Sequence, residues 1–419
     1  MSLESTNFLT WIIAGAAIAG VIVRPIRWPE AIWAVGGAIL LVISRLISPG
    51  DALRAVEKGG DVYLFLAGMM LLSEVARREG LFDWVATCAV NAGHGSPRRL
   101  FVLVYAVGTT VTIFLSNDAT AVVLTPAVFA AARKAKVEPL PCLFVCAFIA
   151  NAASFVLPIS NPANLVLYSD RTPVLGDWLA RFALPSMLSI LATYAALRFV
   201  ERRGLVGSYR SGIAQPTLSR GGWTAFGGIV LTAVVLLIVS TLDVRLGLPT
   251  AIMGGLTLLA VLIRDRTAPW PVLKEISWSV ILLVAGLFVL VEALTRTGLI
   301  AVLASLLQVG AKYSADMAAG VAGAAIALAG NLTNNLPSGL VASLALAQAH
   351  VAQRITDALL IGVDLGPNLS ITGSLATILW LAAIRREGET VTFWQFFKVG
   401  AVVMPPALIL ALGARLLFG

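Results

Sequence analysis

Apolar residues in this 419-residue chain gather into long runs and do not alternate with polar ones. Most runs are about 17–25 residues long, the length at which an α-helix crosses a bilayer, and none has the two-residue period of a strand. The pattern predicts an all-α polytopic membrane protein with about ten spanning helices. We expect these helices near residues 7–23, 30–44, 61–76, 140–168, 177–199, 223–241, 249–263, 277–294, 356–384 and 400–417.

Two further apolar stretches, 100–133 and 316–349, carry polar residues at their centres. The first contains Ser116, Asn117 and Asp118 in FLSNDATAVVLTP, and the second contains Asn334 and Asn335 in AGNLTNNLPSGLVA. Non-helical backbone at membrane depth survives only against protein or a water-filled cavity, where Ser and Asn can cap a returning helix. The pattern predicts two hairpins with polar tips.

The flanks of the first stretch indicate that it does not cross the membrane. Arg98 and Arg99 precede it, and Arg133, Lys134 and Lys136 follow it, so both ends carry the basic residues typical of the cytoplasmic side. Each arm would have about 16 residues, roughly 24 Å, which is less than the ~30 Å hydrocarbon core. We therefore expect a re-entrant hairpin whose tip lies near the middle of the membrane.

Composition and charge agree with a membrane protein and indicate its orientation. Hydrophobic residues make up 58% of the chain and charged residues 12%, about half the charged share of a soluble domain. The net charge of +8 comes from Arg and Lys scattered in short loops, without the aromatic platforms of a nucleic-acid site. One set of loops holds 20 of the 30 basic residues, which predicts that this side is cytoplasmic and that both termini lie outside. These residues are Arg24, Arg27, Arg77, Arg78, Arg98, Arg99, Arg133, Lys134, Lys136, Arg198, Arg202, Arg203, Arg210, Arg220, Arg264, Arg266, Lys274, Arg385, Arg386 and Lys398. The N-terminus lacks the features of a cleaved signal peptide, so we expect 7–23 to be a retained span.

An internal repeat relates the two halves of the chain. DVYLFLAGMMLLSEVARREGL, from residue 61, matches SVILLVAGLFVLVEALTRTGL, from residue 279, at an offset of 218 that also relates Asn117 to Asn335. The matched residues are Gly68, Glu74 and Gly80 with Gly286, Glu292 and Gly298. We predict a first repeat at 1–199, a cytoplasmic linker at 200–222 and a second repeat at 223–419. Five spans in each half would invert the second repeat, which is the architecture of secondary transporters.

Two of the expected spans are interrupted by proline. NAASFVLPISNPANLVL contains Pro158 and Pro162, and GVDLGPNLSITGSLATILW contains Gly366-Pro367. Proline removes a backbone donor and breaks a helix, and Asn161-Pro162 and Gly366-Pro367 each predict a cap followed by proline at the first helical position. Four helix N-termini would then converge with partial positive charge. Arg and Lys are absent from all four interrupted stretches, so the pattern favours a site for an oxygen-rich solute without a cationic side chain.

Three of these segments resemble a known family. SNDATAVVLTP, TNNLPSGLV and especially GVDLGPNLSITGSLATILWL are similar to the signature segments of ArsB-type arsenite/antimonite efflux permeases, within the ion-transporter superfamily. The resemblance extends over nearly the whole chain. It departs from the divalent-anion symporters, which resemble one another in having Ser-Asn-Thr at both tips, and it departs from ArsB at Asn151, where that family tends to have an acidic residue.

The resemblance implies export of trivalent arsenite or antimonite across the cell inner membrane, driven by proton entry and without a cofactor. Neutral arsenite needs donor and acceptor side chains, for which we name Ser116, Asn117, Asn161, Thr333, Asn334 and Asn335. Carboxylates inside a membrane are costly and usually functional, so Asp118 and Asp364 are the proton-coupling candidates, and Glu74 and Glu292 are weaker ones. A soluble arsenite-stimulated ATPase is a partner that the resemblance allows, because the chain has no GxxxxGK[ST] loop.

Other interpretations of the same residues stay open. Asp118 can be only a helix cap, Asp364 can serve only the broken helix, Asn117 and Asn335 can tie the tips to their neighbours, and Glu74 and Glu292 can be interfacial. We interpret Cys142 and Cys146 as small buried hydrophobes, and His94 and His350 form no metal constellation. A sodium/proton antiporter of the NhaD type is the alternative function. A membrane-embedded enzyme would need a nucleophile and base that the sequence does not show, so we expect no enzyme.

Overall fold

The computed structural model describes residues 3–23, 28–168, 172–242 and 244–418, and all regular secondary structure in these ranges is helical. Arg24 and Arg27, assigned above to the cytoplasmic side, lie outside the described residues. The first half contains α1 (Leu3–Val23), α2 (Glu30–Ile43), α3 (Pro49–Lys58), α4 (Gly60–Arg78), α5 (Leu81–Ala92), α6 (Pro97–Phe114), α7 (Asn117–Ala119), α8 (Thr125–Ala135), α9 (Leu140–Ala152), α10 (Pro162–Leu167) and α11 (Leu175–Val200). The second half contains α12 (Arg220–Thr241), α13 (Gly247–Asp265), α14 (Trp270–Glu275), α15 (Ser279–Arg296), α16 (Leu299–Tyr313), α17 (Ala315–Thr333), α18 (Asn335–Ala349), α19 (Gln353–Leu365), α20 (Leu375–Arg386) and α21 (Phe393–Phe418).

The same succession of elements occurs twice. α9 and α19 have 13 residues each and begin 213 positions apart, and α11 and α21 have 26 residues each and begin 218 positions apart. The glycines of the sequence repeat, Gly80 and Gly298, have φ angles of 74° and 88° at the start of α5 and α16. Only glycine adopts this backbone without strain, which explains their place in the repeat. That the second half is inverted relative to the first remains a prediction.

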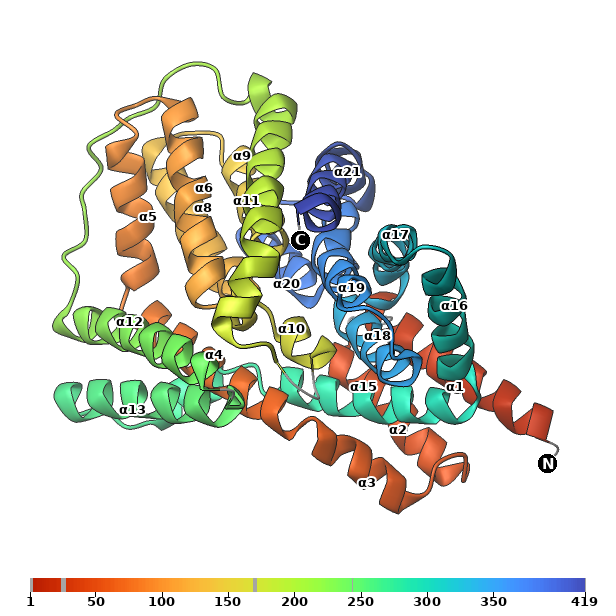
Figure 1. The fold of residues 1–419 in the computed structure, drawn as a ribbon. Helices are drawn as coiled ribbons and strands as arrows, with labels where there is room; N and C mark the ends of the chain where they lie inside the picture. The colour runs from red at the N-terminus through yellow and green to blue at the C-terminus, as the bar shows by residue number, and fades with distance from the viewer. Residues whose placement is uncertain (1–2, 24–27, 169–171, 243, 419) are drawn as a thin grey trace.

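Helices from both halves form two groups (Figure 1). We call α1, α2, α4, α12, α13 and α15 the scaffold, which runs across the lower part of the view. Here α4 packs against α13 and α2 packs against α15, so each half supplies one helix to each pair. Above the scaffold lie the two hairpins, the two interrupted helices α9–α10 and α19–α20, and the pair α11 and α21.

Glycine allows the scaffold pairs to approach closely. A Cβ atom at Gly68 on α4 would lie 2.3 Å from the carbonyl oxygen of Thr250, and one at Gly254 on α13 would lie 2.5 Å from that of Gly68. At the equivalent crossing, a Cβ at Gly286 would lie 2.7 Å from the carbonyl carbon of Ala34. Close backbone contact of this kind is how helices associate in a membrane.

The structure adds helices that the apolar pattern did not predict. α3, α5, α14 and α16 were not among the predicted spans, and α5 and α16 pack against the hairpins. In the described part of the chain, seven helices are long and apolar enough to cross a membrane, or eight if α3 and α4, bent by 50°, are one span. This set includes α6 with 18 residues and α17 with 19, so the prediction of 16-residue hairpin arms was too short.

The predicted linker lies against α5 and joins the two groups. After Arg203 the chain has no regular structure until α12 begins at Arg220. The hydroxyl of Tyr209 donates to the carbonyl oxygen of Val90 (2.6 Å), and the side chain of Asn91 accepts from the backbone of Ile213 (3.0 Å). The middle of the linker is therefore held against α5.

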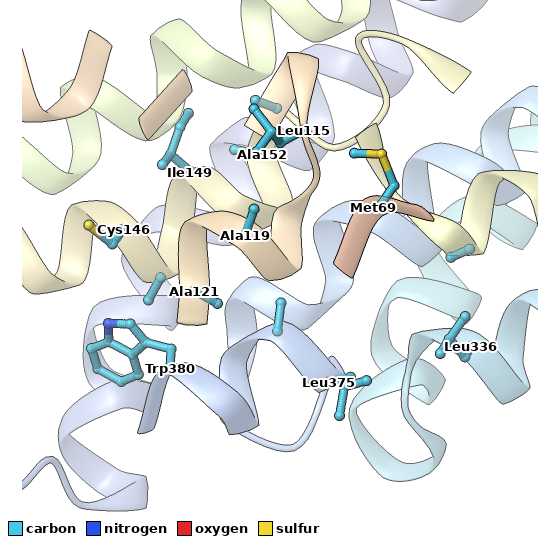
Figure 2. Close-up of a cluster of buried hydrophobic side chains, with 14 of the residues drawn as sticks. Met69, Leu115, Ala119, Ala121, Cys146, Ile149, Ala152, Leu336, Leu375 and Trp380 are labelled. Atoms are coloured by element: carbon cyan, nitrogen blue, oxygen red, sulfur yellow. The ribbon is translucent and has the colours of Figure 1, made fainter. Parts of the chain in front are cut away.

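Buried apolar side chains of α9 and α20 pack against the first hairpin. Figure 2 shows Ala119 and Ala121 of the hairpin beside Cys146 and Ile149 of α9 and Trp380 of α20. Cys142 and Cys146 are buried free thiols, in agreement with their interpretation as small hydrophobes. The core of this region therefore comes from both halves of the chain.

Candidate transport site

The first hairpin reverses direction at Ser116. The hydroxyls of Thr112 and Thr120 are 2.8 Å apart, a contact that a continuous helix could not make across eight residues. Ser116 caps the returning helix, because its Oγ accepts from the backbone N–H of Ala119 (3.1 Å). Asn117 is buried, and its Oδ1 accepts from the N–H of Asp118 (2.9 Å). A five-residue π-helical segment, Thr120–Leu124, follows, and such segments are frequent at functional sites.

Asp118 faces a cavity and does not cap the helix. It is half-buried and lines a cavity of about 80 Å³ together with Ser116, Pro162 and Glu74. The capping role that the alternative interpretation gave to Asp118 belongs to Ser116. Among the residues lining this cavity no Lys or Arg occurs, although Arg77 binds Glu74 with N···O distances of 2.6 and 2.8 Å.

The second hairpin turns at Asn334, whose φ angle is 75°. Its side chain accepts from the N–H of Leu336 and donates to the carbonyl oxygen of Thr372, both at 3.4 Å. The backbone N–H of Asn335 donates to the carbonyl oxygen of Gly373 (2.9 Å). Asn335 is 2% exposed, and its Oδ1 has no hydrogen-bond partner. An orphaned acceptor at this depth is costly and is a candidate contact for a bound solute.

Thr333 is engaged within its own hairpin. Its Oγ1 lies 3.2 Å from the carbonyl oxygen of Ala329, to which it can donate, and 2.6 Å from Oγ of Ser338. The Thr333–Ser338 pair resembles the Thr112–Thr120 pair, since each joins the two arms near the tip. The structure therefore gives Thr333 a structural contact.

The first interrupted helix breaks where proline predicted it. α9 ends at Ala152, Pro158 begins a three-residue 3₁₀ turn, and Asn161 caps α10 by accepting from the N–H of Ala163 (3.0 Å) with Pro162 at the first helical position. Asn164 donates to the carbonyl oxygens of Ser154 (2.8 Å) and Leu157 (3.2 Å). Side-chain amides thus satisfy backbone groups that the break releases.

The second interrupted helix differs from the prediction. Gly366 and Pro367 lie in a 3₁₀ turn, Gly366–Leu369, directly after α19, and they do not cap a helix. The next helix, α20, begins at Leu375 and is capped by Ser374, whose Oγ accepts from the N–H of Thr377 (3.1 Å). Proline marked the end of one helix and not the start of the next. Ser374, a residue type that is favoured as a helix N-cap, was the signal for the start.

Hydrogen bonds tie each interrupted helix to the other half. Asp364 is fully buried, and it accepts from Nδ2 of Asn161 (2.9 Å) and from Oγ of Ser154 (2.7 Å). In the equivalent position of the first half, Asn151 accepts from the capping Ser374 (3.1 Å). Asn161 and Ser374, like Asn151 and Asp364, are 213 positions apart, so the two contacts are related by the repeat.

The carboxylates are not repeated. The residue 218 positions after Asp118 is Leu336, and the residue 213 positions before Asp364 is Asn151. Of these two proton-coupling candidates, each half therefore supplies one, the first at a hairpin tip and the second in an interrupted helix.

A second, larger cavity lies at the other end of α4. Its volume is about 660 Å³, and it is lined by Asp61, Glu292, Lys58, Leu165 and Tyr168 among others. Asp61 is in the first turn of α4 and Glu74 is near its end, so the two cavities lie toward opposite ends of the scaffold. α10 takes part in both, because Pro162 lines the smaller cavity and Leu165 and Tyr168 line the larger. Of the predicted tip residues, Ser116 and Asp118 reach a cavity, whereas Asn335 lines neither.

Two helical hairpins and two interrupted helices packed on a glycine-rich scaffold define a membrane transporter. Residues 10–366 match the family described as CitMHS, citrate transporter, and the chain belongs to this family.

Curated relatives agree with this class. The arsenical pump membrane protein of Escherichia coli K12 is 26% identical over 96% of this chain and 98% of its own length. The arsenical pump membrane protein of Yersinia enterocolitica is 28% identical over 90% and 91%. An uncharacterized transporter of Mycobacterium tuberculosis is 26% identical over 94% of both chains. The predicted resemblance to ArsB-type permeases is confirmed.

A solved structure supports the fold. The Alcanivorax borkumensis YdaH transporter has a TM-score of 0.57 at 14% identity and covers 87% of this chain and 86% of its own. This similarity concerns the fold alone.

Proposed function

We propose that this protein exports trivalent arsenite or antimonite from the cytoplasm and couples export to proton entry. The observation that carries the proposal is the chemistry around the tips and breaks, where amides and hydroxyls are buried beside Asp118 and Asp364. The orphaned Oδ1 of Asn335 could accept from a hydroxyl of the solute. Neutral arsenite needs such partners and no counter-ion.

Citrate, which names the family, fits these residues less well. A tricarboxylate calls for cationic or bidentate partners such as Arg. The quoted tip and break segments contain neither Arg nor Lys, and the cavity that holds Asp118 is lined by acidic Glu74 and Glu275. The charge around the tips therefore favours a neutral solute over a polyanion.

Export of a neutral solute against its gradient requires a coupled charge. Each proton that enters contributes ~2.3 kcal/mol per 100 mV of membrane potential. We assign proton coupling to Asp118 and Asp364. Asp118 faces a cavity without a hydrogen-bonding cation, and Asp364 is held by the neutral donors Asn161 and Ser154.

Everted membrane vesicles test the proposal directly. When the vesicle interior is more acidic than the medium, protons flow outward, which corresponds to proton entry into the cell. Under this gradient we expect uptake of arsenite and no uptake of citrate. Sodium-dependent proton movement without arsenite uptake would instead support the NhaD-type antiporter. Citrate uptake alone would contradict the proposed substrate. Adding a soluble arsenite-stimulated ATPase would show whether that partner increases the rate.

The asparagine at the second tip gives a prediction that separates binding from folding. We expect Asn335→Ala to weaken arsenite binding by about 1–3 kcal/mol without lowering the melting temperature, because Oδ1 makes no bond in the unliganded protein. Asn117→Ala should weaken binding by a similar amount. Titration calorimetry and a thermal melt of purified protein measure the two quantities.

Asn161→Ala is the matched control. This change removes the cap of Ala163 and the bond to Asp364, so it should lower the melting temperature. Unchanged arsenite affinity in both Asn335→Ala and Asn117→Ala would mean that the tips are structural.

The re-entrant topology gives a second prediction. In a protein without Cys88, Cys142 and Cys146, single cysteines at Pro97 and Lys136 should react with an impermeant reagent only from the cytoplasm. Cysteines at Ser314 and Val351 should react only from outside, because few basic residues flank the second hairpin. Labelling of positions 97 and 136 from opposite sides would show that the first hairpin crosses the membrane.

A further inference from the structure

A buried ionic cluster lies at the end of α10 that is remote from Asn161. Asp357 on α19 is fully buried, and its Oδ2 accepts from Nε (2.9 Å) and an Nη (2.6 Å) of Arg415 on α21. Its Oδ1 accepts from the hydroxyl of Tyr168 (2.6 Å) and from Nε2 of Gln353 (2.9 Å). Arg181 on α11 lies 3.9 Å from the same oxygen. The cluster thus joins elements of both halves.

The cluster and Asp364 together hold α10 at both ends. Asn161 and Tyr168 are the residues that flank α10. Asn161 donates to Asp364, and Tyr168 donates to Asp357. The two donors are seven residues apart, as are the two acceptors, in opposite order. Seven residues are close to two helical turns, so α10 lies antiparallel to α19 with one buried carboxylate at each end.

The two carboxylates that accept from α10 differ in their other partners. Asp364 is bound by an amide and a hydroxyl, both neutral. Asp357 is bound by a guanidinium through two hydrogen bonds, with a second guanidinium close by. Hydrogen bonds with an ionised donor or acceptor are about twice as strong as neutral ones, and a buried ion pair is costly to separate, so Asp357 is firmly joined to Arg415 of α21. The Tyr168 end of α10 is therefore tied through Asp357 to both α19 and α21, whereas Asp364 at the Asn161 end is held by the neutral side chains of Asn161 and Ser154.

α10 is also the wall between the two cavities. Pro162, at its start, lines the cavity of Asp118, whereas Leu165 and Tyr168 line the 660 Å³ cavity. Pro162 and Leu165 are less than one helical turn apart. Movement of this short helix would therefore change which cavity reaches the tips.

We propose that Asp357 is a positioning residue for transport: with Arg415 and Tyr168 it pins the C-terminal end of α10 to α19 and α21. The wall between the cavities then moves with the interrupted helix of the other half and pivots at Tyr168, while the Asn161 end exchanges its contacts. This inference takes its meaning for transport from the proposed function, but its contacts and its test require no substrate.

A reporter cysteine in the wall tests the pivot. In the full-length protein carrying Cys88→Ser, Cys142→Ala and Cys146→Ala, Leu165→Cys is placed in the larger cavity, where Leu165 is 4% exposed. Its reaction rate with an impermeant thiol reagent is measured in membrane vesicles without arsenite. We expect Tyr168→Phe to raise this rate about tenfold, because it removes one bond to a charged acceptor and keeps the ring.

Tyr105→Phe is the matched control. Tyr105 is also buried, and its hydroxyl donates to the carbonyl oxygen of Ile190 (2.6 Å), away from α10. This variant should leave the reporter rate unchanged while costing similar thermal stability. Equal rates in Tyr168→Phe and the parent, or an equal rise in Tyr105→Phe, would overturn the pivot.

Gln353→Leu is a second variant for the same test, and it should disturb folding less than a change at a buried residue. Gln353 is exposed, and its Nε2 contacts both Asp357 (2.9 Å) and the Tyr168 hydroxyl (3.2 Å). We expect about a threefold rise in the reporter rate. No rise in a folded Gln353→Leu protein would count against the pivot. Failure of arsenite uptake with the reporter pattern intact would instead refute the proposed function alone.

Discussion

Asp118→Asn should abolish accumulation of arsenite driven by the proton gradient while arsenite binding persists. The substitution keeps the shape of the side chain and removes its ionisation. It also spares the helix cap, which Ser116 provides. At 100 mV one coupled proton supplies ~2.3 kcal/mol, about a 50-fold concentration ratio, and this ratio should fall to one. Uptake into everted vesicles measures it.

Asp83→Asn is the control for this prediction. Asp83 is an exposed carboxylate in the first turn of α5, so it shares the helical position of Asp118 without the cavity. Accumulation should be unchanged in this variant. If Asp118→Asn retained the parent ratio and rate, Asp118 would not carry the proton.

Gly254→Val should cost about 3 kcal/mol of stability, at the upper end of overpacking effects. A Cβ at Gly254 would meet the backbone of Gly68 at 2.5 Å, and neither backbone can yield without separating α13 from α4. Thermal melts in detergent, followed by size-exclusion chromatography, measure the loss.

Gly255, next to Gly254 on α13, is the control that shows whether the loss of stability comes from the contact between α13 and α4. A Cβ at Gly255 on the same helix would have no atom within 4 Å, and the helix propensity of valine is the same at both sites. Gly255→Val should therefore leave stability nearly unchanged. Comparable losses at the two positions would show that valine disturbs α13 itself and not its contact with α4.

Much of the architecture could be predicted because apolar runs, proline and charged loops act locally. The chain reversal at Ser116, the break before Pro162 and the cap at Asn161 each follow from a residue's own backbone chemistry. The pairing of Asn161 with Asp364 could not be predicted, since nothing local relates residues 203 positions apart. Spacing within one helix likewise gave no sign that Asp357 and Asp364 hold the two ends of α10.

Short helices and the second cap were the main failures. α5 and α16 have 12 and 15 residues and are shorter than a full span, but length alone does not explain the failure, since α2 with 14 residues was predicted. Gly366-Pro367 was interpreted as a helix start because Asn161-Pro162 is one, yet α20 begins at Leu375. The residue that caps α20 is Ser374. This serine was not considered because the helix start was assigned to the proline.

The unequal placement of Asp118 and Asp364 bears on the balance between the inward-open and outward-open forms of the protein. In a transporter built from inverted repeats, two identical halves that exchange roles would make the inward-open and outward-open forms equivalent by two-fold rotation and equal in free energy. Asp118 corresponds to Leu336 in the other half, and Asp364 corresponds to Asn151, so the two halves are not identical and the two forms would differ in free energy. On the proposed proton coupling, protonation of Asp118 or Asp364 would therefore change the free energies of the two forms by different amounts. The gradients of solute and coupled ion set the direction of net transport, whereas these two side chains, in an otherwise duplicated frame, affect how the two forms are populated.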